Sequence, residues 1–180
     1  NAGMCATDQI KNFFAGCYTG TCNDGSSNIV IGTNAARGSS TVSNNTGSYN
    51  IAFGQCALRD LTSGGSNVVI GCNSGKAVTE GGDNVFLGRY TGYNVTTGSK
   101  NIAIGCQIAI SGATASTELA IGHAGDRWIQ GDSSYNICLA KCNIKALASG
   151  TLCATSFVGD GSNLTGVGLS ADADLNLFAT

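Results

Sequence analysis

Residues 67–88 read NVVIGCNSGKAVTEGGDNVFLG and contain nearly the same five-residue phrase at both ends. The phrase NVVIG at 67–71 returns as NVFLG at 84–88, an offset of 84 − 67 = 17 residues. A short fixed period is typical of repeat architectures, and this period is too short for a pair of helices. It suffices for one coil of a β-solenoid with two short strands and two turns. The stretch therefore predicts a ladder of stacked coils.

The phrase, which we call a rung, runs through most of the chain. Seven copies start at positions 12, 28, 50, 67, 84, 101 and 118, with spacings of 16, 22, 17, 17, 17 and 17. A partial copy starts at Asn136 after 18 more residues. The first column is Asn12, Asn28, Asn50, Asn67, Asn84 and Asn101, followed by Glu118. The fifth is Gly16, Gly32, Gly54, Gly71, Gly88 and Gly105. We expect the Asn side chains to hydrogen-bond along the stack and the glycines to permit a sharp bend.

Three apolar columns lie between the Asn and the Gly. The second and fourth columns face the same way in a strand, and we expect them to fill the core. The third column is Val30, Ala52, Val69, Phe86, Ala103 and Ala120, and it faces the other way. A strand that is apolar on both faces is buried on both faces. We expect another chain to cover the third column as a trimer interface, with a packed element of the same chain as the alternative.

The composition agrees with closely stacked strands. The chain of 180 residues has 27 Gly and no Pro, and only 11% of its residues are charged. Pro would remove a ladder donor, and like charges would repel when stacked. The net charge of −2 gives no basic surface for nucleic acid or for an anionic membrane. No apolar run approaches the ~20 residues of a membrane span. We expect neither a nucleic-acid nor a membrane partner.

The nine Cys are an odd number, so at least one is free or paired to another chain. Cys17, Cys72 and Cys106 share the sixth column, directly after the Gly, and are candidate interchain thiols. Small residues packed at a turn are the alternative. No Cys or His spacing matches a zinc site, and the single His supports no catalytic triad. We therefore expect no metal, no cofactor and no enzymatic activity.

The rungs predict the organisation of the chain. We expect 1–11 to end a preceding coil, 12–122 to form the regular array, and 123–150 to form divergent coils. Residues 151–169 read as a turn-rich junction, and 170–180 as the start of a coil that the next unit continues. The last five residues, NLFAT, resemble the rung at 12–16, so residue 180 of one unit would be followed structurally by residue 1 of another. The five-residue insertion before Asn50, together with Trp128 and Tyr135, offers candidate receptor contacts.

The pattern N-[IV]-[AVF]-[IFL]-G, with T-x-G turns, resembles the heads of trimeric adhesins of bacterial surfaces. It resembles tail-fibre proteins of tailed bacteriophages more closely, because the segment GDGSNLTG at 159–166 often accompanies such rungs there. The resemblance implies a parallel homotrimer. The expected fold is an all-β parallel solenoid, β-roll or triple β-helix of ~17-residue coils, assembled as an intertwined or side-by-side trimeric fibre.

The expected function is that of a structural segment of a viral tail fibre for host attachment, located in the virion. The partners would be further copies of the chain and a host cell-surface receptor bound elsewhere on the fibre. The alternatives are a bacterial surface adhesin or a head-to-tail extracellular filament subunit. A fibre that degrades polysaccharide is a third, weaker reading.

Overall fold

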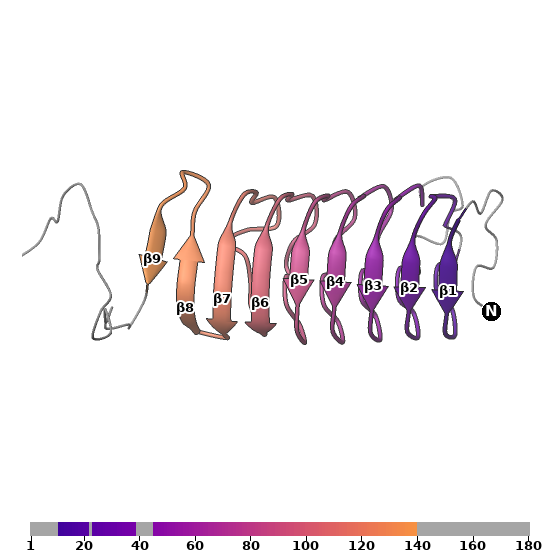
Figure 1. The fold of residues 1–180 in the computed structure, drawn as a ribbon, viewed down its shortest axis with the longest axis horizontal. Helices are drawn as coiled ribbons and strands as arrows, with labels where there is room; N and C mark the ends of the chain where they lie inside the picture. Colours follow the sequence, from indigo (N-terminus) through magenta and orange to yellow (C-terminus); the bar gives the residue numbers. More distant parts are fainter. Residues whose placement is uncertain (1–10, 22, 39–44, 140–180) are drawn as a thin grey trace, which may run out of the picture. The chain divides into compact units, whose positions relative to one another are not determined.

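The computed structural model describes residues 11–21, 23–38 and 45–139. These residues form nine strands and no helix, in a single sheet whose order follows the chain from β1 to β9 (Figure 1). The strands are β1 (Phe13–Ala15), β2 (Ile29–Ile31), β3 (Ile51–Phe53), β4 (Val68–Ile70), β5 (Val85–Leu87), β6 (Ile102–Cys106), β7 (Leu119–His123), β8 (Asp126–Gly131) and β9 (Ile137–Leu139).

The first seven strands are parallel and pair column by column. In β4 and β5, for example, Val68 pairs with Val85 and Ile70 pairs with Leu87. The same register holds from β1 to β7, including across the longer coil between β2 and β3. The prediction of an all-β solenoid with coils of about 17 residues is confirmed. Because the register follows the repeat, the five extra residues before β3 are absorbed outside the strands.

A second wall closes each coil opposite the sheet. It consists of the turn segments that follow each Gly, and these also hydrogen-bond from rung to rung. The N–H of Gly75 donates to the carbonyl of Thr91 at 2.8 Å, and that of Thr79 donates to Thr96 at 2.9 Å. Backbone groups outside the strands are thus satisfied by the neighbouring coil, as buried backbone requires. Each coil is therefore bonded to its neighbours on both walls.

The interior between the two walls is lined by the third column, which corrects our expectation. Val30, Ala52, Val69, Phe86, Ala103 and Ala120 are at most 1% exposed in the single chain. They pack against buried turn residues such as Leu58 and Val78. The third column is therefore the core, and it is not available as a trimer interface. Because the coil is thin, its interior takes the column that contains alanines, while the bulkier second and fourth columns face outward.

The first column forms a continuous side-chain ladder, as expected. The Asn67 side-chain oxygen accepts from both the backbone N–H and the side-chain amide of Asn84, each at 3.0 Å. The Asn84 amide also donates to the carbonyl of Gly98 at 3.0 Å, which ties the sheet to the turn at the far end of the coil. These Asn side chains are fully buried. The ladder ends at Glu118, whose N–H donates to the Asn101 side chain at 3.0 Å.

Replacing Asn84 with alanine should lower the free energy of unfolding by about 3 kcal/mol, because two or more buried groups lose their partners. The N–H of Asn101 would lose its acceptor, and the Gly98 carbonyl would lose its donor. Urea unfolding followed by circular dichroism measures the change. Thr97→Ala, in an exposed position of the same coil, serves as the control. Equal stability of the two variants would show that the ladder contributes nothing.

The parallel array ends at β7, and β8 and β9 then run antiparallel. His123 pairs with Asp126 across a two-residue turn, in which Gly125 has φ 78°. Such a tight turn reverses the strand and omits the second wall of a coil. Our expectation of divergent coils from residue 123 is therefore wrong for the described part, 123–139. Residues 1–10 and 140–180, and with them the junction and the proposed joining of chain ends, lie outside the described residues.

Candidate interaction surfaces

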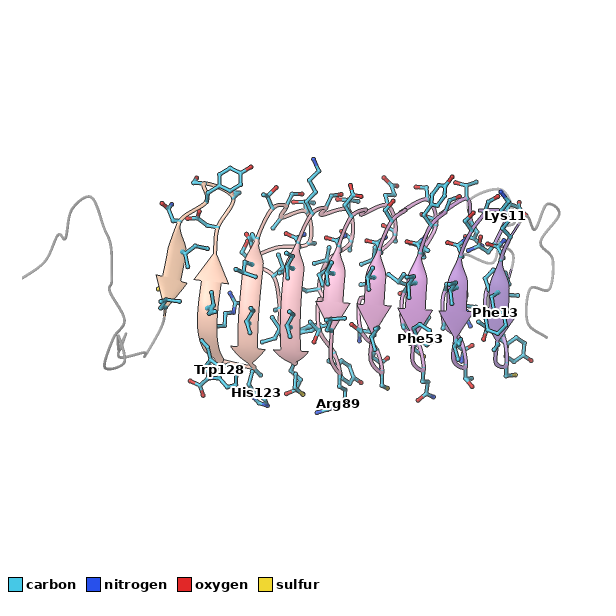
Figure 2. All side chains as sticks on the ribbon, in the orientation of Figure 1. Lys11, Phe13, Phe53, Arg89, His123 and Trp128 are labelled. Carbon is cyan, nitrogen blue, oxygen red and sulfur yellow. The ribbon has the colours of Figure 1, made fainter. Side chains whose placement is uncertain are left out.

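The outward face of the sheet carries two columns of apolar side chains. The second column runs through Phe13, Ile29, Ile51, Val68, Val85, Ile102 and Leu119, and the fourth through Ala15, Ile31, Phe53, Ile70, Leu87, Ile104 and Ile121. Ile29, Ile70 and Ile102 remain 42%, 43% and 42% exposed. Phe13 and Phe53 are labelled on β1 and β3 in Figure 2. We call these two columns the outward face.

No charged side chain interrupts the outward face from β1 to β7. Seven rungs at the ~4.8 Å spacing of neighbouring strands make a stripe about 30 Å long. Soluble proteins rarely leave a contiguous apolar stripe in contact with water unless another surface covers it. The outward face is therefore the apolar side of the sheet that the fold of this chain leaves uncovered.

The sixth column lies at the edge where each strand meets its turn. Cys17, Cys72 and Cys106 are free thiols, and each is at least partly exposed. An Arg89 nitrogen lies 3.6 Å from the sulfur of Cys106, and His123 is the strand partner of Cys106 on β7. The three thiols are separated along the column by other residue types, so disulfides between them within one chain do not form. They remain candidate interchain thiols.

The two aromatic candidates for receptor contact lie near the end of the array. Trp128 on β8 is 64% exposed, and Tyr135 in the turn between β8 and β9 is 81% exposed. The Tyr135 turn is organised by Asp132, whose carboxylate accepts from the Asn136 amide at 2.9 Å and from the N–H of Ser134 at 2.9 Å. These hydrogen bonds, chiefly the one from the Asn136 side chain, hold the pKa of Asp132 below its usual value.

The inserted coil is only partly described, because residues 39–44 lie outside the described ranges. Within it, Tyr49 is exposed and directly precedes the Asn50 rung. A site that the sequence reading missed lies on the turn wall, where Lys76, Tyr90, Tyr93 and Gln107 line a pocket. The signal for it was present, since residues 76 and 93 occupy the same column of successive coils.

The described residues contain no group of three or more His, Cys, Asp or Glu side chains placed to hold a metal ion. Among them there is also no helix long and apolar enough to cross a membrane. No protein-family model matches the chain, and neither the curated proteins nor the solved structures contain a significant match to it.

Proposed function

We propose that the protein is a structural segment of a homotrimeric bacteriophage tail fibre that serves host attachment. The observation that carries this proposal is the outward face, an uncharged apolar stripe repeated rung by rung on seven strands. The resemblance of the rungs and of the GDGSNLTG segment to tail-fibre repeats supplies the biological setting.

A further copy of the same chain fits the outward face best. A partner must match the face over its whole length with the same repeat spacing. A rotation axis parallel to the stacking direction would place identical rungs of each copy at the same height. Each layer of Ile, Val, Leu and Phe side chains would then meet copies of itself, as closed cyclic symmetry requires. Three copies around such an axis would enclose an apolar core between their three sheets.

The assembly is tested by sedimentation of the full chain and of two variants. We expect the wild type to sediment as a trimer of about 54 kDa, from 3 × 18.0 kDa. Ile70→Lys would bury three unpaired charges in the proposed interface and should give monomers, because an unpaired buried charge costs several kcal/mol. Thr97→Lys, in an exposed position of a turn, should remain trimeric. A monomeric or dimeric wild type would overturn the trimer.

The setting in a virion is tested by immunogold labelling with an antibody against the chain. We expect gold particles along the tail fibres of purified phage. Labelling of the surface of bacterial cells that carry no phage would instead identify an adhesin, and would overturn the tail-fibre proposal even if the trimer is confirmed.

A further inference from the structure

A pocket of about 410 Å³ opens on the turn wall of the solenoid and is lined by Lys76, Tyr90, Tyr93, Gln107 and Ala124. Its volume lies within the range of about 300–1,000 Å³ that is usual for small-molecule sites. Four of the lining residues come from three successive coils, and Ala124 comes from the turn between β7 and β8. Their neighbours Ser74, Gly75, Thr91 and Gly92 are buried. The buried positions hold the turn against the core, so the lining residues project outward.

The pocket carries positive charge without an acidic lining residue. The ammonium of the lining residue Lys76 lies 5.3 Å from the centre of the Tyr90 ring. The guanidinium of Arg89, which is not itself a lining residue, lies 5.5 Å from the same ring. Such cation–aromatic contacts hold both side chains beside the ring. Among the described residues, the partner of Lys76 is the Tyr90 ring, and the partners of Arg89 are the same ring and the sulfur of Cys106, none of which carries an acidic group. The pocket therefore favours a ligand with a negative charge.

The other lining groups favour a ligand that is also a polar ring. Tyr93 is 37% exposed and offers an aromatic surface to an aliphatic ring face. Gln107 is exposed and supplies both a donor and an acceptor for hydroxyl groups. A pyranose that carries a carboxylate combines these three features. A bare phosphate would leave the Tyr93 surface unused, and a neutral sugar would leave the two cations without a counter-charge.

We propose that this pocket binds an acidic sugar residue, of the uronic acid type, in a cell-surface polysaccharide. Its carboxylate lies near Lys76 and Arg89, and its ring lies against Tyr93. None of the lining residues belongs to the outward face, so assembly through that face leaves the pocket accessible. Binding to a polysaccharide rests on the proposed attachment function, because the three pockets of a trimer would bind a repeating polymer with avidity. Binding of a single sugar by a single chain does not depend on the attachment function.

The test is a ligand-observed NMR titration of the full chain with methyl glucuronide and with methyl glucoside. The two probes differ only in the carboxylate, which the glucoside replaces with a hydroxymethyl group. We expect the glucuronide to bind at least about tenfold more tightly, as one charge-assisted contact implies. Lys76→Gln should reduce this difference, because only Arg89 then remains near the carboxylate, and Tyr93→Ala should weaken both probes. Lys100→Gln, which changes a residue directly before a rung Asn, should bind as the wild type does.

Equal binding of the two probes, no binding of either, or an unchanged preference in Lys76→Gln would overturn the acidic-sugar site. Thermal unfolding of each variant separates a lost site from a lost fold. Sedimentation of the same samples separates this proposal from the proposed function. A trimer that binds no glucuronide retains the fibre and overturns the site, whereas a monomer that binds glucuronide retains the site and overturns the trimer.

Discussion

Replacing Gly92 with leucine should lower the free energy of unfolding by about 4 kcal/mol, and adding Phe86→Ala in the same chain should restore most of it. A Cβ on Gly92 would lie 2.6 Å from atoms of the Phe86 ring. The ring is fully buried and fills the interior of its coil, so it cannot move aside. Leucine at this position therefore overfills the core.

The rescue is expected because another coil already has the exchanged arrangement. There Ala52 occupies the third column and Leu58 occupies the position equivalent to Gly92, and both are fully buried. Leu58 has φ 50°, close to the φ of 63° at Gly92, so the backbone accepts leucine there. Phe86→Ala alone should cost about 4 kcal/mol through the cavity it leaves. The double variant should lie within about 2 kcal/mol of the wild type, which is a strong departure from additivity.

Urea unfolding of the wild type, the two single variants and the double variant, all at one protein concentration, measures the coupling between Phe86 and Gly92. Gly112→Leu serves as the control for adding a leucine at a turn, because a Cβ on Gly112 would have its nearest neighbour only at 4.0 Å. A double variant as unstable as the sum of the two single variants would show that the third column and the turn wall do not share one packing space.

The period alone predicts the coils and their register, because residues 17 apart stack directly above one another. It also predicts the Asn ladder, since Asn side chains that stack above one another in one column can hydrogen-bond to each other. It does not predict which face of the strand is inside. Ile29, Val30 and Ile31 are all apolar, so hydrophobicity does not distinguish the faces. Side-chain volume carries the signal, because a large residue in the third column faces a small turn residue and a small one faces a large turn residue, as Phe86 with Gly92 and Ala52 with Leu58 show.

The remaining differences have local causes. The reversal at β8 depends on the tight turn at Gly125. The partial rung at Asn136 predicts a further parallel coil instead, and the turn prevents that coil from forming. The pocket on the turn wall depends on columns that vary in residue type. Lys76 and Tyr93 become recognisable as neighbours only when the coils are aligned by their Asn, because 17 residues separate them in sequence.

Gly71→Ala should destabilise the array by about 4–5 kcal/mol, although it adds only one methyl group. Gly71 has φ 136°, a conformation that L-residues rarely adopt. A Cβ there would lie 2.4 Å from the carbonyl oxygen of Gly88 on the next rung, which is backbone and cannot rotate away. The two rungs must separate, and the hydrogen bond from the N–H of Gly88 to the carbonyl of Ile70, now 2.7 Å, would lengthen.

The effect should exceed that of an ordinary surface substitution because coils are stabilised mainly by their neighbours. A separation at Gly71 interrupts the sheet, the Asn ladder and the turn wall at the same level, in the middle of the described array. Gly112→Ala adds the same methyl group where there is space, and should change stability by less than about 1 kcal/mol. Thermal unfolding of the two variants provides the comparison. If both unfold alike, the Gly column serves only the turn, and close contact between rungs does not hold the solenoid together.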